Sequence, residues 1–167
     1  MVRQGRADIV CDFQLTDPLH YSDVLGQVAL AIVPPSVGGL LAPLVAPLST
    51  VRSSAASART AVVGGDAPTP VQVALAGPVT DPWVRVGGVL VGLRGSLAYD
   101  DVVTIDARTT TVLRADGASV AGMLAPRTRP LPELRLAPGE HEVTFGGIDP
   151  TGTATAVVSW RDAWRSL

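Results

Sequence analysis

Residues 99–120, YDDVVTIDARTTTVLRADGASV, decide the fold class of this chain. Within them Val103 and Ile105 alternate with polar residues, which is the period-two pattern of a half-buried strand. Residues 109–113 are rich in β-branched side chains, which fit a pleated surface better than a helical turn. The stretch therefore predicts a strand, a short turn and a second strand, and it commits the chain to an antiparallel β fold.

A second and sharper turn is predicted at Asp116-Gly117. This dipeptide is typical of two-residue hairpin loops, because a type I′ turn needs a positive φ at both central positions. Residues 71–75, 141–145 and 154–160 repeat the alternating pattern, and Gly or Pro lies between the segments. Short strands that recur at such spacing predict an all-β, antiparallel sandwich without a helix longer than a turn or two.

The composition is that of a small-residue β protein with an unusually uncharged surface. The chain has 167 residues, of which 47% are hydrophobic and only 4% aromatic, so that Val, Leu and Ala must fill its core. Charged residues make up 17%, against about 25% in an ordinary domain. We expect part of this surface to be covered by a partner.

The charge pattern argues against two classes of partner. The formal net charge is −2, and all 13 basic residues are arginines without a basic stripe, so no nucleic-acid partner is expected. Residues 28–48 are apolar but contain four prolines and two glycines, which argues against a membrane-spanning helix and against membrane insertion. The single Cys11 excludes an internal disulfide.

Composition shifts along the chain predict four segments. Residues 1–33 form an N-terminal arm, and within it residues 7–15 alternate between apolar and polar side chains as an amphipathic strand does. Residues 34–69, rich in Ala, Pro and Ser, are predicted to be a connector without a core of its own. Residues 70–152 form the sandwich, and residues 153–167 a terminal strand that we expect to dock with the arm.

No motif in the sequence predicts catalysis, a metal site or a cofactor. His141-Glu142 begins like a zinc-protease motif, but no second His follows at the required spacing, and His20 lies without a companion ligand. Asp100 and Asp101 lack the spacing of a calcium loop and are read as a solvated turn. We therefore expect a protein that is not an enzyme and that binds no metal or cofactor.

Aromatic residues supply the candidate binding positions. Trp83 follows a turn and is a candidate for stacking on a sugar, with capping of the core as the alternative. Two further tryptophans lie within the last eight residues, and a free terminus would not carry such large apolar rings. With the amphipathic strand of the arm, they predict a subunit interface formed by Ile9, Phe13, Tyr21, Trp160 and Trp164.

Several segments, taken in series, resemble the siphophage distal tail proteins and related minor tail proteins, particularly those of actinobacterial phages. The matching segments are DPLHYSD (17–23), the Gly-Gly-Leu to Pro stretch (38–47), the segment containing AGPV (73–83), VTID leading to TV and DG (103–117), LAPG before VTF (136–145) and VVSWRDAW (157–164). Together they cover nearly the whole chain.

This resemblance implies a ring, usually hexameric, at the distal end of the virion tail, assembled in the cytoplasm of the host bacterium. The ring joins the tail tube to the tip or baseplate through an N-terminal belt domain, and a C-terminal galectin-like, jelly-roll sandwich points outward. The present chain opens at what resembles the last strands of the belt. We expect either a short or split version of that domain, or a ring that relies on another protein.

Three functions follow as expectations. The first is a structural tail-tip component that pairs its β edges with other copies of itself and with tube and tip or hub proteins. The second is a carbohydrate-binding module for a host-surface glycan; the chain has no Asn, so it lacks one member of the His, Asn, Arg, Trp and Glu cluster of galectins. The third, a cell-wall hydrolase, lacks paired carboxylates or a nucleophile motif.

Overall fold

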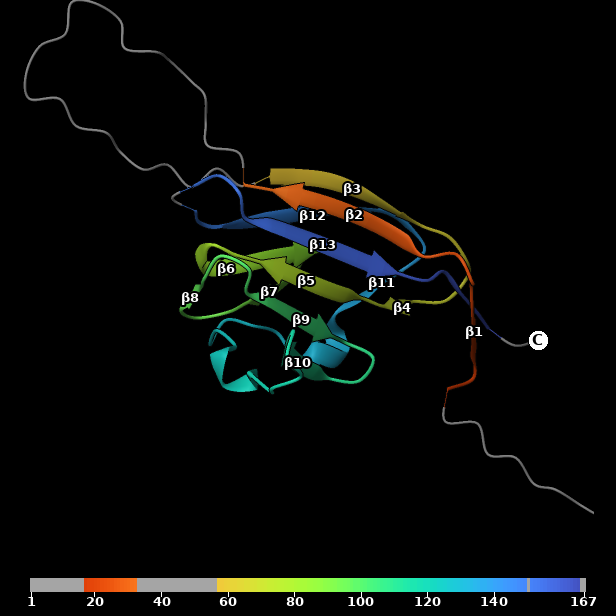
Figure 1. Ribbon diagram of the computed structural model, residues 1–167. Helices are drawn as coiled ribbons and strands as arrows, with labels where there is room; N and C mark the ends of the chain where they lie inside the picture. The colour runs from red at the N-terminus through yellow and green to blue at the C-terminus, as the bar shows by residue number, and fades with distance from the viewer. Residues whose placement is uncertain (1–16, 33–56, 150, 166–167) are drawn as a thin grey trace, which may run out of the picture.

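The computed structural model describes residues 17–32, 57–149 and 151–165 and consists of antiparallel β-strands (Figure 1). The predicted all-β sandwich is therefore confirmed. In chain order the strands are β1 (Leu19–Tyr21), β2 (Gly26–Ala31), β3 (Ser57–Val63), β4 (Thr69–Pro70), β5 (Gln72–Ala76), β6 (Val79–Val86), β7 (Val89–Gly92), β8 (Ser96–Leu97), β9 (Val102–Asp106), β10 (Thr111–Arg114), β11 (Arg135–Leu136), β12 (Gly139–Ile148), β13 (Thr155–Trp160) and β14 (Ala163–Arg165). Two short 3-10 helices, η1 (Ala121–Met123) and η2 (Leu131–Glu133), interrupt them.

Two five-stranded sheets make up the sandwich. The first has the strand order β10-β9-β5-β13-β2, and the second has the order β3-β12-β6-β7, with β8 beside β6. Two short ribbons, β1 with β14 and β4 with β11, lie outside these sheets. Strand β13 comes late in the chain but lies inside the first sheet, between β5 and β2 (Figure 1).

The core lies between the inner faces of the two sheets. In the first sheet Val73 is paired with Ile105 on one neighbour and with Val158 on the other, and all three side chains are fully buried. In the second sheet Phe145 is paired with Val84, and both are fully buried. Alternation along each strand thus places β-branched and aromatic residues on one shared core, as a two-sheet sandwich requires.

The stretch that decides the fold forms β9 and β10, but its second turn differs from the prediction. Gly117 has a φ of +85°, whereas Asp116 is not at positive φ, so the turn is not type I′. Leu113 is bridged to Ser119, and the N–H of Gly117 donates to the carbonyl of Arg114 at 2.9 Å. The loop is longer than two residues, and such a loop needs only one residue, here a glycine, in the left-handed region.

The sandwich extends beyond the segment boundaries predicted from composition. β3 lies in the predicted connector 34–69, yet it pairs with β12 along its whole length and buries Ala61 and Val63. β2 lies in the predicted arm 1–33, yet it pairs with β13 as part of the first sheet. The amphipathic strand predicted at 7–15 lies outside the described residues.

One side of the sandwich is closed by the chain itself. The outer edge of β10 is covered by the next turn, where Val120 N–H donates to the carbonyl of Val112 at 2.9 Å. The outer edge of β7 is covered by the following segment, where Ala125 N–H donates to the carbonyl of Gly92 at 2.8 Å. We call this the capped side, because residues 115–129 satisfy backbone groups on the edges of both sheets.

The opposite side carries the edge strands β2 and β3, which lie next to one another (Figure 1). Among residues 17–32, 57–149 and 151–165, no strand pairs with the outer edge of either. We call this the open side. Unpaired edge strands are templates for the addition of another strand, and proteins that use none of them usually cover or charge them.

Candidate functional site

Trp83 lies on β6 and on the outer face of the second sheet, because its neighbours Val84 and Pro82 are buried. Its cross-strand partners are both glycines, Gly146 on β12 and Gly92 on β7. The indole occupies the space above Gly146, where an added Cβ would come within 2.6 Å of the indole Cε2. Because neither neighbouring residue has a side chain, the indole lies close against the sheet and is half-buried.

A groove of about 540 Å³ lies beside Trp83, between β6, β7 and the segment 125–128. Its apolar surface comes from Trp83, Pro82, Leu90 and Leu93, and Gly92 lies among them. Drug-sized and saccharide ligands occupy concave sites of this size, lined by apolar groups with a few polar ones. A larger but more polar concavity of about 700 Å³ lies at the other end of the sandwich, beside Tyr21 and Arg108.

Hydrogen bonds hold the far wall of the groove against β7. The hydroxyl of Thr128 accepts from the N–H of Gly92 at 3.1 Å and donates to the carbonyl of the same residue at 3.0 Å. Arg129 N–H donates to the carbonyl of Leu90 at 3.0 Å, and Arg94 N–H donates to the carbonyl of Met123 at 2.6 Å. The groove is therefore formed before any ligand binds, which lowers the entropic cost of binding.

The groove carries an excess of positive charge. Arg85 comes from β6, Arg94 from the segment after β7, and Arg127 from the far wall, and all three side chains are exposed. The nearby carboxylate of Asp81 accepts a hydrogen bond from Gly95 N–H at 2.8 Å. Within the described residues, no ion pair engages any of the three groove arginines.

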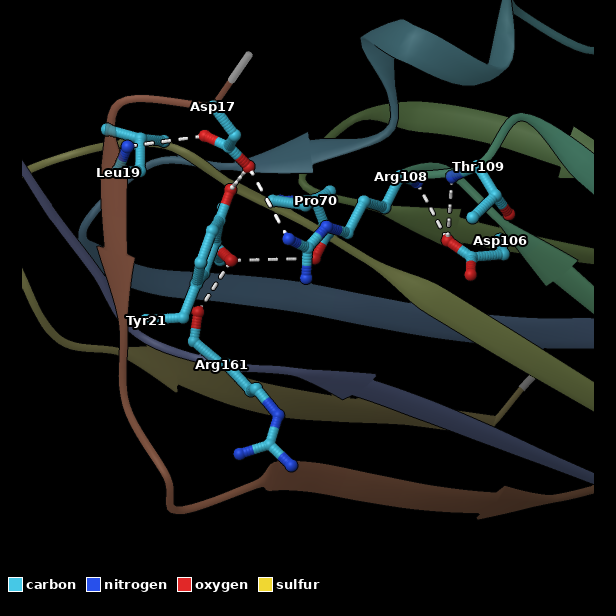
Figure 2. A network of polar contacts seen from close by, with 9 residues as sticks. Asp17, Leu19, Tyr21, Pro70, Asp106, Arg108, Thr109 and Arg161 are labelled. Atoms are coloured by element: carbon cyan, nitrogen blue, oxygen red, sulfur yellow. Dashed lines mark hydrogen bonds and ion pairs between the residues drawn. The ribbon is translucent and has the colours of Figure 1, made fainter. Parts of the chain in front are cut away.

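A second polar site surrounds Tyr21 on β1 (Figure 2). The phenolic hydroxyl donates to the carboxylate of Asp17 at 2.8 Å, and the Arg108 guanidinium lies 3.7 Å from the same carboxylate. The guanidinium carbon also lies 4.9 Å from the centre of the Tyr21 ring, a cation–π distance. Burial raises the pKa of Tyr21, and the hydrogen bond to Asp17 and its negative charge raise it further.

The same site ties β1 to the end of β13. The buried hydroxyl of Thr69 donates to the carbonyl of Arg161 at 2.6 Å, and the Arg161 guanidinium donates to the carbonyl of Ser22 at 2.9 Å. Since Tyr21, Arg108 and Arg161 all contact groups of their own chain, this second site is organised as an internal clamp. Its geometry supports a structural role more than ligand binding.

The structure separates the residues predicted to form one interface. Trp160 is only 5% exposed and packs against Gly26, so it belongs to the core of its own chain and the interface prediction for it is wrong. Its place on the central strand β13 is the reason. Tyr21 is half-buried in the clamp, whereas Trp164 on β14 is 41% exposed. Ile9 and Phe13 lie outside the described residues.

The structure places the other chemical candidates apart from one another. Within the described ranges, no three His, Cys, Asp or Glu side chains gather in a way that would hold a metal ion. His141 has its Nε2 at 2.7 Å from the carbonyl of Ala137, a local contact within one turn. No helix in the same ranges has the length and apolarity needed to cross a bilayer.

Comparisons with known proteins give no relative from which to infer a role. No family model matches the chain, and neither the curated proteins nor the solved structures contain a match.

Proposed function

We propose that this chain is a structural, non-enzymatic component of a long non-contractile phage tail tip, of the distal tail or minor tail type. It would assemble by pairing β edges with further copies of itself and with neighbouring tube, tip or hub proteins. The observation that carries the proposal is the contrast between the capped side and the open side of one sandwich. The phage assignment rests on the sequence resemblance, and the mode of assembly rests on the open side.

The backbone of β3 offers hydrogen-bonding groups to a new strand. The carbonyl of Glu142 accepts from Gly87 N–H at 3.2 Å, so the backbone groups of Glu142 point toward β6. Thr60 is paired with Glu142, and in an antiparallel ladder its own N–H and carbonyl must then point away from β12. By the same alternation Ala58 and Val62 also present their backbone groups to the open side.

The occupant that fits this edge best is residues 7–15 of a second copy. That segment alternates apolar and polar side chains as an added strand needs to. It carries Asp8 and Asp12, and the exposed Arg59 on β3 provides the opposite charge. The side chain of Val62, which is 64% exposed, would be covered by such a strand.

The test is the oligomeric state of four forms of the chain, measured by light scattering after size-exclusion chromatography. The full chain should form a discrete oligomer. Deletion of residues 1–15 should give a monomer, and Thr60→Pro should do the same because proline removes the outward N–H. Thr60→Ala is the matched control, since it shortens the same side chain but keeps that N–H, and it should still assemble.

A monomeric full chain would overturn the mode of assembly, and so would a deletion and a Thr60→Pro variant that assemble as well as the full chain. Circular dichroism and thermal unfolding of each variant separate lost assembly from lost folding. The tail assignment is tested by electron microscopy of phage particles labelled with antibody against this chain. Label at the distal end of the tail supports it, and label elsewhere or on no particle rejects it.

A second candidate function, a carbohydrate-binding module for host attachment, is favoured by one specific observation. The indole of Trp83 lies over Gly146 at the rim of a preformed groove, and aromatic rings in such positions bind the apolar faces of sugars. The two functions use different faces, because the groove lies toward the capped side. A glycan array probed with the full chain tests this second function.

A further inference from the structure

We infer that the Trp83 groove binds an anionic saccharide, with the sugar ring against the indole and its carboxylate or phosphate held by the groove arginines. The inference rests on the second candidate function, carbohydrate binding, and does not depend on assembly through the open side. It adds the chemical class of the ligand.

The charge balance of the groove is the first argument. Three arginines line it, and the carboxylate of Asp81 accepts the Gly95 N–H instead of pairing with one of them. In the described part of the chain, ion pairs form at Arg108, which lies 3.7 Å from Asp17, and at Arg129, which lies 3.6 Å from Glu133, but not at the groove arginines. A groove that keeps three unpaired guanidinium groups is complementary to an anion.

The distribution of these arginines is the second argument. Arg85 comes from β6, Arg94 from the segment after β7 and Arg127 from beyond η1, so three separate parts of the chain converge on one groove. Guanidinium groups bind carboxylate and phosphate oxygens in a bidentate manner, and groups on different walls can hold one anion from several directions. The apolar surface between them suits the non-polar face of a sugar ring.

The seat of Trp83 is the third argument. A side chain at Gly146 or at Gly92 would meet the tryptophan, at 2.6 Å from its Cε2 and at 3.2 Å from its Cβ respectively. The indole therefore has one defined position at the groove, and its ordering costs nothing further when a ligand binds. A tryptophan that served only to cover the core would not require a groove beside it.

The test is a titration of the full chain with matched saccharides, monitored by the indole N–H signals in nuclear magnetic resonance spectra. The probes are mannopentaose, its 6-phosphate ester and trigalacturonic acid, which separate neutral, phosphate and carboxylate ligands. We expect the Trp83 signal to shift with one or both acidic probes and not with mannopentaose. The apparent affinity should fall as salt is added, because exposed charges are screened.

Variants assign the binding to the groove. Arg85→Gln, Arg94→Gln and Arg127→Gln should each weaken the binding of the acidic probe by about threefold to tenfold, the range for the net loss of one typical hydrogen bond at a solvent-exposed site. Arg165→Gln removes the same charge from β14, away from both the groove and the open edge of β3, and should leave the affinity unchanged. Trp83→Phe keeps an aromatic ring at this position and should lower the affinity for every saccharide that binds there; because this variant lacks the reporting indole N–H, its affinity is measured by isothermal titration calorimetry beside the unmodified chain.

Each other outcome rejects a defined part of the inference. If mannopentaose binds as well as its phosphate ester, and the arginine variants bind normally, the anionic class is wrong while carbohydrate binding stands. If no saccharide shifts the Trp83 signal, both carbohydrate binding and the inference fail. If Arg165→Gln weakens binding as much as the groove variants, the effect is one of net charge and the groove is not the site.

Discussion

The two sides of this sandwich differ in how the edges of their sheets are covered. On the capped side the chain covers the edges of β7 and β10 with residues 115–129, and it builds the Trp83 groove in doing so. On the open side no described strand covers β2 or β3. The open edges are the ones through which we propose that the chain pairs with further copies of itself. The capped side thus carries covered edges and a groove, whereas the open side carries two edge strands that no described strand covers.

The largest expected effect compares one buried leucine from each side. Leu93 follows β7 on the capped side and Leu30 lies on β2 on the open side, and both are 2% exposed. Each change to Ala should lower the free energy of unfolding by about 2–5 kcal/mol. Leu93→Ala should cost more, because an edge strand paired on one side relaxes into a cavity more readily. Urea unfolding measures both, and a larger loss for Leu30→Ala would contradict the distinction.

The second prediction compares the same substitution on the two sides. Thr128→Val removes both hydrogen bonds to Gly92 and should lower the free energy of unfolding by about 1–2 kcal/mol. Thr60 lies on the exposed face of β3, so Thr60→Val should change the free energy of unfolding by about 0.5 kcal/mol or less. Thermal and urea unfolding provide the values. Equal effects would mean that the capping bonds do not stabilise the capped side.

The third prediction concerns acid stability near the start of β13. Partial burial raises the pKa of Asp149, but hydrogen bonds from Ala154, Thr151 and Gly152 outweigh it and hold the pKa below the usual 3.8. The stabilisation is therefore complete above pH 3.8 and is lost as the pH falls through the lower pKa of the folded state. Its size is on the order of 1 kcal/mol or less, because solvent screens the partly exposed carboxylate.

Asp149→Asn tests this pH dependence of stability, because it removes the ionisable group while keeping a hydrogen-bond acceptor. In urea unfolding measured from neutral pH to below pH 3, the wild-type chain should lose more stability on acidification than the variant. Parallel curves for the two proteins would contradict the assignment.

The fourth prediction concerns the clamp at Tyr21. Tyr21→Phe removes the hydrogen bond to Asp17 and should lower the free energy of unfolding by about 0.5–1.5 kcal/mol. Because the pKa of Tyr21 is raised in the folded state, its stabilisation is present below pH 10 and is lost as the pH rises through the folded-state pKa. Tyrosinate absorbance in a Tyr99→Phe background follows this titration. A folded-state pKa at or below 10 would contradict the prediction.

The sequence predicts the strands that alternate cleanly, and it misses one that does not. Val103 and Ile105 are buried where the pattern placed them, because a half-buried strand leaves a local signal. The Ala, Pro and Ser composition of residues 34–69 predicts a connector where β3 lies, and only the second half of β3 alternates between exposed and buried side chains. An edge strand with a solvent-facing half resembles a loop in composition, and only its pairing with β12 distinguishes it.

The candidate site was predictable in part. Trp83 was identified from its type and its turn, but Arg94 and Arg127 were not, since they reach the groove through a tertiary contact between β7 and residues 123–129. The interface predicted at Trp160 is wrong for a different reason. The alternation of Trp160 with the preceding residues indicated a buried face, yet its position near the chain end suggested an interface. Periodicity indicates which face of a strand is apolar, but it does not indicate which strands will pair with that strand in the sheet.

The central position of β13 has a consequence for synthesis in the cell. Until residues 155–160 have left the ribosome, β2 has no hydrogen-bonded partner in the first sheet, and β5 has one neighbour instead of two. The nascent chain must therefore hold an incomplete apolar surface until β13 has been made, and long-range pairing of this kind forms slowly. Truncated translation products should be found with chaperones or in aggregates, and the sheet should close only when β13 inserts.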